Sequence, residues 1–235
     1  MGRAAALLAL AAPLAAYSAL AEHLPSLPDW GDVAFLSLVV LTATFALVWL
    51  ALPLREVVAT RTLAACALAL ALAAAALSFV GLELAANFAK LGAATLAGWW
   101  FLAFFEAPTW VLLVALLIVP VDLFSVARGP TREITENQPQ VFDAVSIFLR
   151  IPGEQSAAQL GLPDVLFFSL FLGAAVRFAL RPGWSWLAMT LSFGTTLALA
   201  VALDQGGIAA LPLLSAAFVL VNGDRLWAAF RNRPA

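Results

Sequence analysis

The sequence predicts an all-α fold, a polytopic bundle of about eight transmembrane helices. Of its 235 residues, 64% are hydrophobic and only 11% are charged, whereas soluble domains have about 45–50% apolar and about 25% charged residues. So few charges cannot cover a soluble globule of this size with polar groups. The composition therefore excludes a soluble domain and a disordered chain, and it indicates an integral membrane protein.

Eight apolar segments are long enough to cross a bilayer, because a hydrocarbon core of about 30 Å needs about 20 apolar residues in a helix. Charge, Pro or Gly gathers at most of the breaks between them. With no repeat and no long linker, residues 1–235 are predicted to form one membrane domain. The predicted spans lie at roughly 4–21, 32–53, 62–80, 87–105, 108–127, 162–181, 184–203 and 207–223.

The first span also has a second interpretation, as a cleaved signal peptide. Arg3 precedes an apolar run, and Ala19, Leu20 and Ala21 resemble a cleavage site before Glu22. That interpretation would leave seven spans and the same orientation for the rest of the chain.

The arginines predict how the bundle is oriented, since loops rich in Lys and Arg stay on the cytoplasmic side. With eight spans, residues 128–160 form a long extramembrane loop on the side opposite to both termini. We therefore expect cytoplasmic termini, an external loop and a prokaryotic cytoplasmic membrane. The side of the termini carries seven arginines: Arg3, Arg55, Arg61, Arg181, Arg225, Arg231 and Arg233. The opposite loop carries Arg128, Arg132 and Arg150, and acidic residues in the same loop offset their charge.

The rare residue types exclude several classes of site. The single histidine, His23, and the single cysteine, Cys66, exclude a multi-histidine metal site, a thiolate metal cluster and an internal disulfide. A net charge of −2 without a basic stripe gives no reason to expect a nucleic-acid partner. We expect no metal and no cofactor, and the oligomeric state is left open.

Two aspartates stand out, because they lie within or at the start of predicted spans. Asp122 lies inside the fifth span and Asp164 opens the sixth. An intramembrane carboxylate costs at least about 2.5–3.5 kcal/mol, so it is a functional hypothesis by default. These two helices flank one loop and run antiparallel, and both carboxyl groups lie within about 5–9 Å of the same membrane face at 1.5 Å per residue. The spacing therefore allows them to meet.

A pair of neighbouring carboxyl groups titrates as a unit, with one member keeping its proton. An aspartic protease needs this arrangement, because one member activates water while the other polarises the scissile carbonyl. The spacing leaves open a proton or cation relay in a transporter, or a purely structural aspartate. A zinc mechanism needs two histidines in H-E-x-x-H, and a serine mechanism commonly needs a histidine base, so the count of one histidine opposes both.

Three segments resemble the presenilin and signal peptide peptidase family of intramembrane aspartyl proteases, over about residues 108–223. VDLFSVARGPTREITE, residues 121–136, resembles the family's "YD" helix and the Gly-Pro-x-Arg stretch after it. GLPDVLFFSLFLGAA, residues 161–175, resembles the "GxGD" helix, and GIAALPLLSAAF, residues 207–218, resembles the "PAL" region. Order and spacing also fit the family.

The resemblance implies a presenilin-like helical fold, of nine helices in the family, with 108–223 as its catalytic half. It makes Asp122 and Asp164 the catalytic dyad and transmembrane helices the substrates, with no cofactor. The orientation predicted from the arginines, with the loop 128–160 outside, resembles that of signal peptide peptidases. This resemblance implies substrate helices of type II orientation, including leftover signal peptides. The implied substrate-binding residues are Gly161, Leu162, Pro163, Ala210, Leu211, Pro212 and Leu213.

Three positions depart from the family pattern. Val121 replaces the usual Tyr before the first aspartate, Pro163 replaces the second Gly of GxGD, and Ala209 replaces the first Pro of PAL. Proline in the first turn of a helix is tolerated, because that N–H has no intrahelical partner. These changes bear on activity and substrate preference more than on the fold. A weakened family member that binds membrane helices is therefore one rival hypothesis, and a small proton-coupled transporter is the other.

A helix must unwind before water can attack its peptide bonds, and an extended segment in hydrocarbon then needs backbone partners. Pairing as a strand with backbone of the protease would supply them. We expect the backbone of Leu211 to Leu213, whose helical ladder Pro212 interrupts, to take this role with help from the stretch Gly129 to Glu136.

Overall fold

The structure, a computed structural model, describes residues 2–129, 139–205 and 207–231. Helices account for most of them, as the composition predicts. In order, the elements are α1 (Arg3–Leu20), the 3-10 turn η1 (Ala21–His23), α2 (Asp29–Phe35), the π-helical η2 (Leu36–Leu41), α3 (Thr42–Ala51), α4 (Leu54–Val57), α5 (Thr60–Phe79), α6 (Glu83–Leu102), α7 (Pro108–Arg128), α9 (Pro139–Ala144), β1 (Ser146–Arg150), β2 (Ala157–Gly161), α10 (Leu162–Arg177), α11 (Pro182–Ala202) and α12 (Leu211–Arg231).

A helix lies at each predicted span in the described parts of the chain, with α2, η2 and α3 running on as one. Six helical stretches are long and apolar enough to cross a membrane by length and composition. The other two helices, α6 and α10, lie largely inside the bundle. The structure thus supports a membrane-embedded helical bundle, while the number of spans stays a prediction.

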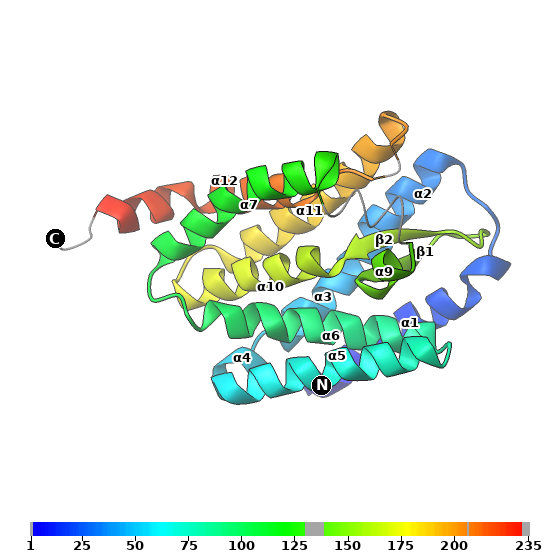
Figure 1. Ribbon diagram of the computed structural model, residues 1–235, viewed down its shortest axis with the longest axis horizontal. Coiled ribbons are helices and arrows are strands. Elements are labelled where there is room, and N and C mark those ends of the chain that lie inside the picture. Colours follow the sequence, from blue (N-terminus) through cyan, green and yellow to red (C-terminus); the bar gives the residue numbers. More distant parts are fainter. Residues whose placement is uncertain (1, 130–138, 206, 232–235) are drawn as a thin grey trace.

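Helix α10 forms the centre of the bundle, since nine of its sixteen residues are buried. Figure 1 shows it between α6 on one side and α7 with α12 on the other. Gly98 lets α6 approach closely: a Cβ there would lie 2.3 Å from the Leu166 carbonyl oxygen and 2.1 Å from Ser169 Oγ. A small residue at this position thus allows the close packing of α6 on α10.

Stacked aromatic rings join α10 to the helices on either side. Phe168 stacks on Phe45 of α3 with ring centroids 4.0 Å apart, and Phe171 stacks on Phe218 of α12 at 4.8 Å. All four side chains are fully buried. A pair at the separation of Phe171 and Phe218 adds about 0.5–1.5 kcal/mol beyond the burial of its area.

The outer helices expose large apolar side chains, as a protein surrounded by lipid does. On α5 these include Leu68, Leu72 and Phe79, and on α7 they include Leu116 and Phe124. A soluble protein rarely leaves so much contiguous apolar surface uncovered. The exposure pattern therefore agrees with the membrane assignment made from composition.

A two-stranded antiparallel hairpin lies in the segment 128–160, which we expected to be only a loop. Its register pairs Ser146 with Gly161 and Phe148 with Gln159. Pro152 and Gly153 lie in the connection, where Gly153 has a positive φ of 72° and donates its N–H to the Ala21 carbonyl. Strand β2 then runs directly into α10. The fold is thus helical except for one hairpin beside the central helix in the described parts of the chain.

Candidate active site

The first turn of α10 places Asp164. Gly161, in extended conformation, precedes the helix, and Leu162 and Pro163 open it. The Asp164 carboxylate reaches back and accepts the Gly161 N–H at 3.2 Å. This is the N3-to-N-cap contact of a capping box, and it fixes the carboxylate beside the junction of β2 and α10. The prediction that Asp164 opens a helix with Pro163 in its first turn is confirmed.

Asp122 lies in the last third of α7, and its carboxylate accepts a hydrogen bond from a distant part of the chain. The donor is the backbone N–H of Leu211, at 3.1 Å. Leu211 is the first residue of α12, and the first intrahelical bond runs from the Leu214 N–H to the Ala210 carbonyl at 3.1 Å. The N-terminal N–H groups of a helix lack intrahelical acceptors and carry partial positive charge. Asp122 therefore supplies an acceptor that the start of α12 would otherwise lack.

Asp122 lies within electrostatic range of the Asp164 carboxyl group. Both side chains are half-buried, so the site is neither sealed from its surroundings nor fully open to them. Helix α10 contacts both α7, which carries Asp122, and α12, which begins at Leu211. Both aspartates thus accept an N–H from the beginning of a helix, and both face the same region.

The segment that resembles PAL contacts Asp122 through the Leu211 N–H, and one expectation about this segment is wrong. Pro212 does not interrupt a helical ladder, because it lies in the first turn of α12, where its missing N–H would have no intrahelical partner. The Leu211 N–H already binds Asp122 and is not free for a substrate. Ala210 and Leu213 are half-buried beside it.

The stretch Gly129 to Glu136, expected to assist in substrate binding, falls outside the described residues except for Gly129. The sequence interpretation missed the hairpin, although the Pro152-Gly153 dipeptide between the two strands is a strong turn signal. It also missed the hydrogen bonds from Asn87 and Lys90 of α6 to the backbone of β1, which no local sequence pattern predicts.

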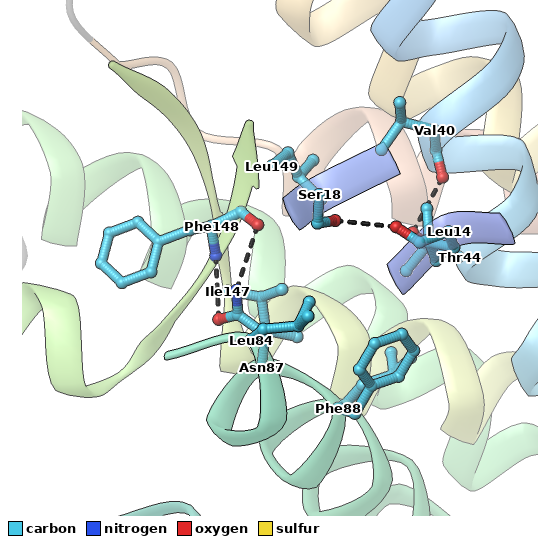
Figure 2. Close-up of a pocket in the computed structure, with 11 residues that line it drawn as sticks. Leu14, Ser18, Val40, Thr44, Leu84, Asn87, Phe88, Ile147, Phe148 and Leu149 are labelled. Atoms are coloured by element: carbon cyan, nitrogen blue, oxygen red, sulfur yellow. Dashed lines mark hydrogen bonds between the residues drawn. The ribbon is translucent and has the colours of Figure 1, made fainter. Parts of the chain in front are cut away.

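A separate pocket lies between α1, α3, α6 and β1, and neither aspartate lines it. Figure 2 shows its mostly apolar walls, with the Ser18 hydroxyl bonded to the Leu14 carbonyl and the Thr44 hydroxyl to the Val40 carbonyl. Among the described residues, no group of three or more His, Cys, Asp or Glu side chains could hold a metal ion.

Comparison with protein-family models gives no match, and comparison with curated proteins and with solved structures gives none either. What the chain does must therefore be argued from its own residues and their geometry.

Proposed function

We propose that the chain is an intramembrane aspartyl protease that hydrolyses peptide bonds of transmembrane helices through Asp122 and Asp164. The observation that carries the proposal is the hydrogen bond from the Leu211 N–H to Asp122, on a helix that contacts α10, whose first turn holds Asp164. In support of the proposal, this hydrogen bond joins two of the three segments that resemble the presenilin and signal peptide peptidase family, 89 residues apart in the chain, and α10 of the third segment contacts α7.

In the proposed reaction the neighbouring carboxyl groups share one proton. The ionised carboxylate takes a proton from water while the water oxygen bonds to the scissile carbonyl carbon, and the protonated carboxyl gives its proton to the carbonyl oxygen. The gem-diol then collapses: the first carboxyl protonates the leaving nitrogen, the second takes back a hydroxyl proton, and the C–N bond breaks. The N–H groups of Gly161 and Leu211 stabilise negative charge at the two positions.

An unwound substrate segment would pair with the outer edge of β2. The backbone N–H and C=O of Phe148 point away from β2 and bond to Asn87. Phe148 and Gln159 are therefore a non-hydrogen-bonded pair of the antiparallel ladder, in which the backbone groups of Gln159 point away from β1. The backbone groups of Ala157 and Gln159 then form an edge that ends at Gly161, three residues before Asp164. A strand added there lies beside the dyad. This edge replaces Leu211 to Leu213 as the proposed partner of the substrate.

We further propose the orientation that the arginines predict, with external residues 128–160 and type II substrate helices. A topology reporter fused after Val145 is then external, whereas a cytoplasmic reporter would overturn this part of the proposal.

The test of the protease proposal is cleavage of a single-span helical reporter in detergent or bicelles. We expect Asp122→Asn and Asp164→Asn each to lower cleavage at least about 100-fold, the usual contribution of a positioned acid or base. Glu106→Gln is the matched control, since Glu106 is an exposed acid just before α7, and it should cleave like the wild type.

The same experiment separates the rivals. If the folded wild type cleaves nothing but still binds the reporter, the weakened family member replaces the protease, and Pro163 and Ala209 become the first positions to revert. If it neither cleaves nor binds, and proton flux across vesicles depends on both aspartates, the transporter replaces it.

A further inference from the structure

Lys90 is a buried lysine that the proposed chemistry does not use. It lies on α6 with only 4% of its surface exposed, and no described carboxylate forms a salt bridge with it. Its ammonium instead donates to two backbone carbonyls, those of Asp143 at 2.8 Å and Ser146 at 2.9 Å. The Phe148 ring lies 5.4 Å from the same nitrogen, within the range of a cation–π contact. Burying an ammonium is costly unless its donors are satisfied, and here backbone and ring satisfy them.

Asn87 lies three residues before Lys90 and so shares its helix face. Its amide nitrogen donates to the Phe148 carbonyl at 3.3 Å, and its amide oxygen accepts the Phe148 N–H at 3.2 Å. Figure 2 shows both bonds, running from the α6 side chain to one residue of the strand. A single side chain thus replaces the partner that a neighbouring strand would supply to Phe148.

Tyr17 of α1 makes a third side-chain contact with the backbone of β1: its hydroxyl donates to the Arg150 carbonyl at 2.5 Å. The backbone N–H and C=O groups of Ser146, Phe148 and Arg150 point away from β2, since these residues form the non-hydrogen-bonded pairs of the ladder. Each has a backbone group bonded to a side chain of α1 or α6. The outer edge of β1 is therefore covered by side chains, one of the ways in which proteins protect a strand edge.

This cover matters for Asp164 because a two-stranded hairpin is marginal by itself. The hairpin continues into α10, and the Leu162 N–H bonds to the Val145 carbonyl at 2.9 Å. Whatever fixes the hairpin therefore also fixes the first turn of α10, in which Asp164 lies.

We propose that Lys90, Asn87 and Tyr17 are positioning residues that clamp β1 onto α6 and α1. The clamp closes one edge of the hairpin, leaves β2 as the edge that accepts an extended chain, and fixes the register of that chain relative to Asp164. The second half of this proposal rests on the proposed protease function. Its consequence is a single preferred cleavage position, because a loosely held strand pairs in more than one register.

The test compares Lys90→Met and Asn87→Leu with the wild type by hydrogen–deuterium exchange of the hairpin amides. Each variant keeps the length or size of the side chain and removes its polar contacts. We expect the amides of residues 146–161 to exchange at least about tenfold faster, the effect of about one lost hydrogen bond to a charged or buried group. Lys90→Arg, which keeps the charge and the donors, should recover most of the protection. Asn222→Leu is the control: it removes a buried, bonded asparagine between α12 and α11, so it should leave hairpin exchange unchanged.

Cleavage products of the same variants give the second readout. The clamp predicts a several-fold higher KM and additional products shifted along the substrate, with kcat much less affected. Unchanged exchange in both variants would overturn the clamp. Faster exchange with an unchanged product pattern and KM would overturn its role in substrate register. The exchange measurement needs no activity, so a wild type that cleaves nothing would contradict the protease and not the clamp.

Discussion

Asp164 and Asp122 each accept one N–H from the start of a helix, but the donors differ in where they come from. The donor to Asp164 is Gly161, three residues away on the same turn. The donor to Asp122 is Leu211, 89 residues away on another helix. The hydrogen bond that orients the Asp164 carboxylate is therefore made within its own turn, whereas the one that orients Asp122 depends on how α7 packs against α12.

The two aspartates also differ in how tightly their helices are packed. Asp164 begins the most buried helix of the bundle. On α7 all the buried residues precede Pro120, so Asp122 lies beyond the well-packed part of its helix. Proline in a helix interior removes one backbone hydrogen bond and loosens the ladder. The difference indicates a dyad with one rigid member and one adjustable member, in which the Leu211 contact holds the adjustable one.

The largest effect should come from Gly98→Ala, which disturbs the packing of α6 on α10, the helix that carries the rigid member Asp164. The added methyl would overlap the Leu166 carbonyl oxygen, and backbone cannot rotate away as a side chain can. Overpacking of this kind costs about 1–3 kcal/mol, and we expect the upper end. Thermal unfolding in detergent should show a Tm several degrees lower.

Gly223→Ala is the matched control for that substitution. Gly223 lies inside α12, and nothing lies within 4 Å of the position that an alanine methyl would take there. Helix propensity alone should therefore raise stability by about 0.5–1 kcal/mol. Equal Tm values for the two alanine variants would contradict the close approach of α6 to α10.

Leu211→Pro tests the adjustable side. Proline fits the first position of a helix, and it removes only the N–H that binds Asp122, apart from the change of side chain. A hydrogen bond to a charged group is worth about 1.5–3 kcal/mol, so we expect kcat to fall about 10–100-fold with little change in KM. Leu211→Ala controls for the lost side chain of this buried residue. If alanine lowers kcat as much as proline, the N–H does not hold Asp122.

The smallest effect should come from Gly161→Ala, which touches the locally held aspartate. A methyl there would lie 3.0 Å from the Asp164 carboxylate, so the carboxylate must shift by a few tenths of an ångström. We expect a loss of about three- to tenfold in kcat, below the effect of a full 1 Å misplacement. Gly207→Ala, with nothing within 4 Å, should be neutral, and equal losses in both variants would show that the contact with Asp164 does not matter.

The same contrast explains what the sequence could predict. Composition and apolar periodicity predict the membrane class and the positions of the long helices, because these depend on local chemistry. The start of α10 at Leu162, with Asp164 in its first turn, is also a local property of Gly161, Pro163 and their neighbours.

Contacts between distant segments could not be predicted from such patterns. The bond from Leu211 to Asp122 requires α7 to pack against α12, and no local signal specifies that. Lys90 lies near the start of the span predicted at 87–105, and in the structure its ammonium binds carbonyls of α9 and β1 that are more than fifty residues away. Strands of five residues within a long polar segment are also too short to stand out by periodicity.

The most direct test of the paired aspartates is binding of a peptide that carries a hydroxyl-bearing tetrahedral carbon in place of the scissile carbonyl. If the two carboxyl groups act as one dyad, the wild type binds this peptide, and Asp122→Asn and Asp164→Asn each weaken binding at least about 100-fold, as expected for contacts to a transition-state mimic. Tight binding that survives either substitution, or a folded wild type that does not bind, would contradict the dyad.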